Sequence, residues 1–393
     1  MNRVAVQTLS ILPLAAYLLF LVLFSLARPL YTWDTVPYTA TALEETSDSA
    51  AQLHQRTYSY LQSELSAEQF APLVAGSYAQ ALYRDPDAFA SQLDMYRIKP
   101  AYVGALRLLG ALGIEPLDAL ALLSLVPAIL LCVLLCHWLC RYRSLLEASL
   151  LVVLFALAAR ITDLSRVPVP DTLSALVVFA AVYALAYRGW LRVAALLLVA
   201  SVFVRTNNIL FSGLVLLWLG WASYARRSDT ETDSPRWTFF AASLFASCAG
   251  YFALNAAYDY QWWRLFFHTF VESQATITAF AEDFSFATYS AVVRSALGQL
   301  VAGGATLATA LPLFLLLLSV AAGDAWRTIL REVAQPGGFS SESRLPMATA
   351  LCLPVIAAFF LLFPLVLGWD RFFLPFYALI TAFAASQLGQ PRR

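Results

Sequence analysis

Residues 8–35 read TLSILPLAAYLLFLVLFSLARPLYTWDT. The apolar part ends at Ala27, and its length of about 20 residues matches the thickness of a bilayer for a helix that rises 1.5 Å per residue. Arg28 and then Asp34 follow, at the start of a long polar segment. The pattern predicts a first transmembrane helix and an acidic residue held beside the membrane surface.

A cleavable signal peptide is the alternative interpretation of the same apolar run. Ser25 and Ala27 are small residues at the spacing that a signal peptidase requires. The hydrophobic region of a signal peptide is about 7 to 15 residues long, which is shorter than this run. We therefore expect the segment to be retained as a transmembrane helix.

The composition extends this interpretation to the whole chain. Of the 393 residues, 60% are hydrophobic and 13% are charged, with a mean hydropathy of +0.69, which is too apolar for an ordinary soluble domain. Further apolar runs lie at roughly 118–140, 145–159, 171–187, 191–204, 208–222, 238–256, 296–320, 347–367 and 372–388. We expect one all-α transmembrane domain over 1–393 with about ten membrane-spanning helices.

The positions of the arginines predict the orientation. If the N-terminus is cytoplasmic, most arginines fall in short internal connections or at the C-terminus, as the positive-inside rule requires. These are Arg141, Arg143, Arg188, Arg192, Arg226, Arg227, Arg236, Arg327, Arg331, Arg344, Arg392 and Arg393. Two long polar segments, 28–117 and 257–295, then lie outside.

Both external segments show helical patterns. In 28–117, Leu53, Leu61 and Leu65 recur at helical spacing, and Asp85-Pro86 is typical of a helix N-cap followed by proline. We expect amphipathic helices on the outer membrane surface. In 257–295, an aromatic stripe predicts an interfacial helix that belongs to an aromatic belt or flanks a lipid tail. It consists of Trp262, Trp263, Phe266, Phe267 and Phe270.

Sequence signatures of soluble enzymes and metal sites are missing. The chain has no P-loop, dinucleotide-binding, serine-hydrolase or zinc-protease motif, and only three histidines. Cys132, Cys136 and Cys140 share one face of an apolar run, where packing is the favoured interpretation over metal binding. The formal net charge of +0 gives no reason to expect nucleic acid as a partner.

Charged residues at the external ends of the predicted helices are the candidates for chemistry. The set comprises Asp34, Arg97, Lys99, Arg160, Asp163, Arg166, Asp171, Arg205, Asp370 and Arg371. Arginines in short external loops run against the positive-inside rule, and phosphate binding would explain them because the guanidinium fork matches a phosphoryl group. Local pairing of Arg371 with Asp370, Arg160 with Asp163 and Arg166 with Asp171 is the alternative.

The overall arrangement resembles the GT-C superfamily of integral-membrane glycosyltransferases, which includes protein O-mannosyltransferases and aminoarabinose transferases. The resemblance rests on the Asp after the first helix, a large external loop with surface helices, about nine further spans, and the late segment Asp370-Arg371-Phe372-Phe373-Leu374-Pro375-Phe376. It covers most of the chain but is architectural, with short motifs.

The resemblance implies roles for individual residues. Asp34 corresponds to the acid that acts as general base on the acceptor hydroxyl or helps to bind a metal. The candidate substrate-binding residues are Arg97, Lys99, Tyr102, Arg160, Asp163, Asp171, Arg205, Asn207 and Arg371, and the donor phosphate would meet Arg205 and Arg371. Many relatives carry two adjacent acids where this chain has Asp34 followed by Thr35, so no cofactor is assigned and a divalent metal stays open.

The expected function is transfer of a sugar from a polyprenyl-phosphate donor to a lipid, glycan or protein acceptor, in contact with membrane lipids. The expected location is a bacterial inner membrane, with the site facing the periplasm or exterior. A flippase or transporter of lipid-linked saccharide is the first alternative, and it predicts internal repeats and polar groups near mid-span. A glycan polymerase or ligase, or a scaffold role, is the second.

Overall fold

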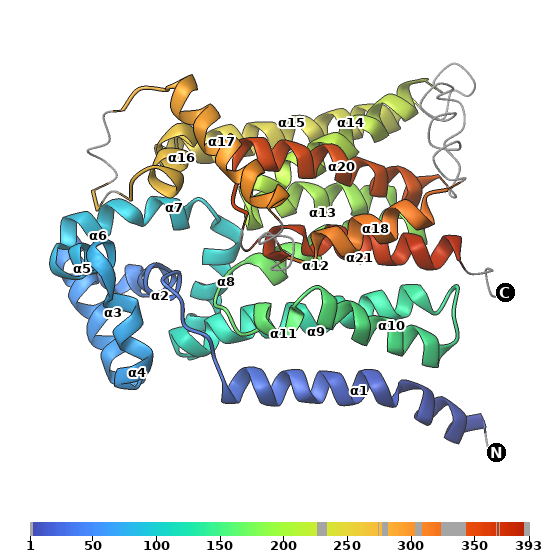
Figure 1. Cartoon of the computed structure of the whole chain (residues 1–393), viewed down its shortest axis with the longest axis horizontal. Helices are drawn as coiled ribbons and strands as arrows, with labels where there is room; N and C mark the ends of the chain where they lie inside the picture. Colours follow the sequence, from blue (N-terminus) through green and yellow to red (C-terminus); the bar gives the residue numbers. More distant parts are fainter. Residues whose placement is uncertain are drawn as a thin grey trace.

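The computed structural model describes residues 3–225, 234–273, 275–276, 282–302, 309–323, 343–366, 368 and 370–388. Over these residues the protein is helical and contains no β-strand. Figure 1 shows a bundle of long helices and a group of shorter helices that covers one end of it. We call this covered end the distal end, and the end that carries both chain termini the terminal end.

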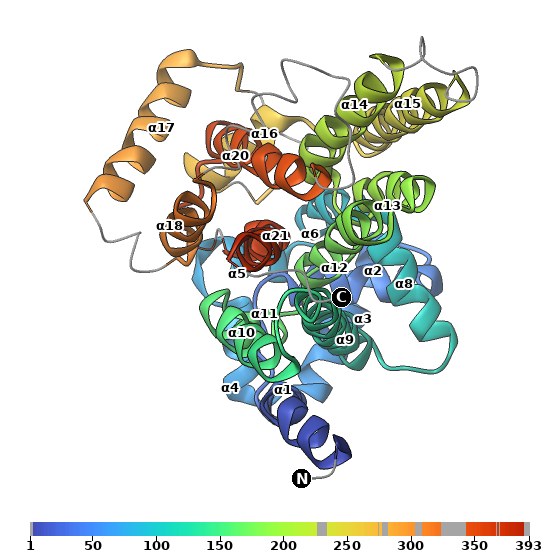
Figure 2. The ribbon, with the colours of Figure 1, turned by 90° about the vertical axis from the view of Figure 1, so that its right-hand side faces the viewer.

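The bundle contains the long apolar helices. Its elements are α1 (Arg3–Ala27), α9 (Pro116–Leu139), α10 (Leu145–Ala158), α11 (Ile161–Leu164), α12 (Asp171–Val182) with the π-helical turn η3 (Tyr183–Arg188), α13 (Leu191–Val204), η4 (Thr206–Asn208), α14 (Ile209–Ala225), α15 (Ser234–Ala257), α18 (Leu311–Ala321), α20 (Arg344–Leu362) and α21 (Asp370–Gln387). Seen along the bundle in Figure 2, α12 and α21 pack side by side near its middle.

Six helical segments are long and apolar enough to cross a membrane: Leu9–Ala27, Pro116–Leu139, Asp171–Arg188, Thr206–Ala225, Trp237–Ala257 and Arg344–Leu362. The protein is therefore a helical membrane protein, but the expected ten crossings are not confirmed. Three further apolar helices, α10, α13 and α18, have only 14, 14 and 11 residues. They are shorter than the roughly 20 residues of a full crossing.

The segment between α1 and α9 folds into a helical cap at the distal end (Figure 1). It contains α2 (Thr35–Leu43), η1 (Glu44–Thr46), α3 (Ala50–Glu64), α4 (Ala67–Phe70), η2 (Ala71–Val74), α5 (Gly76–Arg84), α6 (Pro86–Gln92), α7 (Asp94–Arg97) and α8 (Pro100–Ala111). The predicted cap of α6 is confirmed, because the Asp85 carboxylate accepts hydrogen bonds from the amides of Asp87 and Ala88 at 2.9 and 3.2 Å.

The apolar stripes of the cap helices face one another. Leu53 and Leu61 of α3 are buried in one cluster with Phe89 and Leu93, and Val36 of α2 joins them. These stripes therefore form a shared core within the cap, and the location of the cap on the outer membrane surface stays a prediction. Burial of apolar surface stabilises a protein by about 25 cal/mol per Å², which favours such mutual packing.

The second polar segment supplies α16 (Trp262–Phe270) and α17 (Phe286–Val301), which lie against the distal end of α20. The indole of Trp262 donates to the Leu362 carbonyl at 2.8 Å, and the Tyr289 hydroxyl donates to the Leu361 carbonyl at 3.0 Å. The aromatic stripe thus forms the predicted helix and packs on a neighbouring span.

Thiol labelling tests the orientation of this fold. In a background with Cys132, Cys136, Cys140, Cys248 and Cys352 replaced by Ala, we expect an impermeant thiol reagent to label Ser63→Cys in α3 from outside the cell. Arg141→Cys, beside the terminal end of α9, should react only after permeabilisation. Labelling of Arg141→Cys in intact cells would contradict the orientation.

Candidate functional site

The distal end of the bundle brings together charged residues from the beginning, middle and end of the chain. One Asp34 carboxylate oxygen lies 3.5 Å from Nη1 of Arg371, and the other accepts a hydrogen bond from the Tyr96 hydroxyl at 3.1 Å. The side chains of Asp34 and Arg371 are 28% and 33% exposed, so the pair is open to solvent and can exchange partners. Asp34 precedes α2 but makes no side-chain cap on it, so its carboxylate is directed at the site.

A second ion pair lies beside the first. Arg205 pairs with Asp171, and their side chains are only 13% and 1% exposed. The guanidinium carbons of Arg205 and Arg371 lie 4.3 and 4.8 Å from the centre of the same ring, that of Phe372. Two cations therefore share one aromatic side chain, a geometry that concentrates positive charge at one point.

The backbone at each charged residue is fixed by local contacts. Asp171 is the first residue of α12, and Arg205 follows α13 directly. The Asn208 amide donates to the Ser174 hydroxyl at 2.8 Å, which ties the turn after Arg205 to α12. In this way two short connections of the bundle are held next to each other.

Asp370 holds the start of α21. Its carboxylate accepts hydrogen bonds from the Ala310 amide at 2.8 Å and from the Tyr377 hydroxyl at 2.9 Å. The alternative of a local pair between Asp370 and Arg371 is therefore wrong, because consecutive residues of a helix point in different directions. Asp370 faces the protein interior, while Arg371 reaches Asp34.

Arg166 places the segment that leads to Asp34. Its Nε donates to the Arg28 carbonyl at 2.5 Å, and the Leu30 amide donates to the Arg166 carbonyl at 3.1 Å. The alternative of a pair between Arg166 and Asp171 is also wrong, since Arg166 lies 3.7 Å from Asp163 and Asp171 pairs with Arg205. Arg166 therefore connects the segment after α11 to the chain that leaves α1 by hydrogen bonds.

Lys99 lies among tyrosines on the cap side of the site. Its ammonium donates to the Tyr38 hydroxyl at 2.8 Å and to the Met95 carbonyl at 3.1 Å, and it lies 4.9 Å from the centre of the Tyr96 ring. Burial lowers the pKa of Lys99 to about 7, with Arg205 and Arg371 acting in the same direction and Asp34 against them. Its charge is thus decided near neutral pH, although the residue is only half-buried.

A compositional signal that the sequence reasoning missed also points to Lys99. The chain contains 24 arginines and a single lysine, and that lysine is residue 99. A guanidinium stays protonated in proteins, whereas an amine can lose its proton. At position 99 a lysine can lose its proton near neutral pH, whereas an arginine would keep its charge. Tyr38 was missed as well, although its spacing from Asp34 places both on one helix face.

We call Asp34, Lys99, Asp171, Arg205 and Arg371 the Asp34 cluster. Tyr102, also predicted to bind substrate, borders it, since its ring lies 4.9 Å from that of Tyr38. Its hydroxyl is buried and has no hydrogen-bond partner among the described residues.

Four predicted site residues are held elsewhere. Arg97 pairs with Glu44 and Asp94 within the cap. Arg160 pairs with Asp163 at 3.1 Å, as the local-pairing alternative expected. Asn207 is exposed, and the neighbouring Asn208 makes the inward contacts. The rotation of each helix about its axis and the geometry of the loops determine which way these side chains point, and neither can be predicted from residue spacing.

Acidic residues at the site face cations. In the part of the chain that the structure describes, no three His, Cys, Asp or Glu side chains gather to form a metal site. Asp34 and Asp171 each contact a guanidinium instead.

Titration of Lys99 tests the electrostatics of the cluster. Because the chain has one lysine, ¹³C-methylated Lys99 should give one ε-amine NMR signal, with a midpoint near pH 7 instead of about 10.4. Between these values the unfolded chain holds the proton and the folded chain does not, so the free energy of unfolding should rise with pH in this window. Lys99→Arg should remove the titration, and a midpoint near 10 would contradict the description of the cluster.

Comparisons with known proteins identify no match: no family model fits the chain, and no curated protein or solved structure is significantly similar to it. The function proposed below therefore rests on the geometry and charge of the Asp34 cluster.

Proposed function

We propose that this protein is a membrane glycosyltransferase of the GT-C type, which moves a sugar from a polyprenyl-phosphate donor to an acceptor hydroxyl. The observation that carries the proposal is the Asp34 cluster itself. A solvent-accessible carboxylate lies 3.5 Å from one guanidinium, a second guanidinium lies beside the same Phe372 ring, and a titratable lysine senses all three charges. A proton acceptor and a phosphate-binding group are thus adjacent, where a lipid-linked substrate would place its head group.

Asp34 is the proposed general base. Its carboxylate is not used to cap α2, and it is partly open to solvent. The Tyr96 hydroxyl orients one of its oxygens, which leaves the other to face Arg371. A general base must come within hydrogen-bond reach of the proton that it removes, and this second oxygen meets that condition once Arg371 takes another partner.

The donor phosphate is that other partner. A phosphoryl group and a carboxylate compete for the same guanidinium fork, so donor binding to Arg371 would release Asp34 for the acceptor. Arg205 stays fixed by its buried pair with Asp171 and presents the second cation beside the Phe372 ring. Lys99 would add a third positive charge when protonated, because an approaching anion raises the pKa of a neighbouring amine.

In the proposed step the acceptor oxygen attacks the anomeric carbon, and its proton passes to Asp34. The bond between the anomeric carbon and the phosphate oxygen breaks, and the electron pair stays on the phosphate. Polyprenyl phosphate leaves with its negative charge held by Arg205, Arg371 and Lys99. Such preorganised cations stabilise developing charge more strongly than water does.

The location of the cluster favours transfer over transport. Asp171 begins α12, Arg205 follows α13 and Arg371 is the second residue of α21, so these charges lie at helix ends. Transporters place their substrate sites near the middle of the membrane, commonly at broken helices. A glycan polymerase or ligase would use the same cluster and the same chemistry with a larger acceptor.

Asp34→Asn tests the base. Asparagine keeps the volume of the side chain but cannot take up the acceptor proton, so turnover should fall by at least about 10². Release of polyprenyl phosphate from a turned-over donor is the measurement. Asp163→Asn, which removes an exposed carboxylate at the same end, is the matched control and should stay active. An Asp34→Asn enzyme with most of its activity would remove Asp34 from the mechanism.

Arg371→Ala and Arg205→Ala test phosphate binding. Each should weaken donor binding about tenfold or more, because a charge-assisted hydrogen bond is worth about 1.5–3 kcal/mol. Lysine at either position should restore part of the affinity, since it keeps the charge but lacks the bidentate fork. Arg160→Ala serves as the control, as Arg160 pairs with Asp163 outside the cluster. Donor affinity that is unchanged in both cluster variants would refute the assignment.

A further inference from the structure

The terminal end of the bundle contains two cavities that the glycosyltransferase proposal does not use. The first has a volume of about 820 Å³ and is lined by Gly189, Trp190, Leu191, Arg192, Val193, Phe239, Phe240 and Arg344. The second, of about 580 Å³, is lined by His137, Cys140, Arg141, Tyr187, Arg188 and Trp190. Trp190 belongs to both, so the two cavities adjoin at its side chain.

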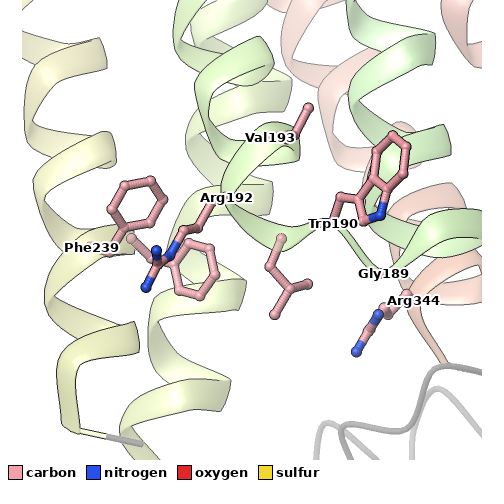
Figure 3. A pocket seen from close by; sticks show the side chains of 8 residues that line it. Gly189, Trp190, Arg192, Val193, Phe239 and Arg344 are labelled. Atoms are coloured by element: carbon pink, nitrogen blue, oxygen red, sulfur yellow. The ribbon is translucent and has the colours of Figure 1, made fainter.

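Four arginines line this cavity pair. Figure 3 shows Arg192 beside Phe239 on one side of the first cavity and Arg344 below Gly189 on the other. Arg141 and Arg188 line the second cavity. Among the described residues that line either cavity, none is acidic. Positive charge from three separate parts of the chain thus converges on one hollow.

Aromatic rings and a backbone contact hold three of these arginines in place, Arg141, Arg188 and Arg344. Arg141 and Arg188 both lie 5.4 Å from the centre of the Tyr187 ring, and Arg188 lies 5.3 Å from that of Trp190. Nη1 of Arg344 donates to the Leu185 carbonyl at 3.2 Å. Stacked guanidiniums lose less freedom when they bind an anion, because their planes are already oriented.

The rest of the wall of the first cavity is apolar, and the helices that form it carry exposed apolar side chains suited to lipid. Leu191, Val193 and Phe239 line the cavity. Beyond it, Leu196 of α13 and Phe245 of α15 are 59% and 74% exposed. Because α15 contains a membrane-spanning segment and packs against α13, acyl chains would cover these side chains. A ligand with a phosphate at one end and a hydrocarbon chain at the other fits both parts.

We propose that this cavity pair binds the headgroup phosphate of an anionic membrane lipid, with the acyl chains lying along α13 and α15. Basic pockets between transmembrane helices at one membrane face are typical binding sites for such headgroups. A free phosphate ion would use the same arginines but would gain nothing from the apolar wall. The site is separate from the Asp34 cluster and does not depend on the proposed transferase activity.

Binding of phosphatidylglycerol is the test. The full-length protein is held in neutral phosphatidylcholine nanodiscs, phosphatidylglycerol is titrated in, and bound lipid is counted by native mass spectrometry after release. Arg188→Gln/Arg192→Gln should retain phosphatidylglycerol at least about tenfold less strongly than the wild type, because two charge-assisted contacts are lost. Both residues are exposed, so the variant should fold. Arg344→Gln should give a similar loss and serves as an independent variant.

Arg84→Gln/Arg294→Gln is the matched control, since it removes two exposed arginines away from the cavities. It should retain the lipid as the wild type does. Equal loss in the control and the cavity variant would show a general charge effect and overturn the proposal, as would unchanged binding in the cavity variant. A third arm adds glycerol 3-phosphate or inorganic phosphate. If either displaces phosphatidylglycerol at equal concentration, the site binds a soluble anion and the lipid proposal is wrong.

Discussion

The contact between Asp34 and Arg371 is the interaction on which the proposed chemistry of the distal end depends. It joins the segment that leaves the first helix to the first turn of the last helix, so residues from both ends of the chain meet here. Arg166 fixes the approach of one partner, and Asp370 fixes the helix start that carries the other. α12 and α21 pack side by side through the apolar core, and Asp171, Arg205 and Phe372 meet beside the pair.

The net charge of the Asp34 cluster depends on the protonation of Lys99. Two carboxylates balance two guanidiniums, so the net charge of the five residues equals the charge of Lys99. Burial lowers the pKa of Lys99 to about 7, which places this charge under the control of the surroundings. An arginine there would carry a permanent charge, and the single lysine of the chain allows the cluster to gain positive charge as an anion arrives.

The sequence predicted the helical membrane class and the candidate charges more reliably than their partners. Asp34, Asp171, Arg205 and Arg371 each stand at the end of an apolar run on the same predicted side, so their approach could be expected. The partner of each charge could not be predicted, because pairing depends on the rotation of each helix about its axis. Arg371 therefore pairs with Asp34 and not with its neighbour Asp370. Asn207 is exposed, and Asn208 makes the contact with α12. The packing of the cap helices and the partial burial of Lys99 are tertiary effects that residue spacing alone cannot predict. The number of crossings could not be predicted either, because helices such as α10 and α13 are apolar but shorter than a full crossing.

A donor panel tests the central claim most directly. The purified protein, reconstituted in liposomes, is supplied with a series of polyprenyl-phosphate sugars and candidate acceptors, and lipid products are identified by mass spectrometry. We predict that at least one donor loses its sugar, with equal amounts of free polyprenyl phosphate and glycosylated product formed. Transfer of intact lipid-linked sugar between leaflets, without release of polyprenyl phosphate from any donor, would contradict the assignment of a transferase site at Asp34.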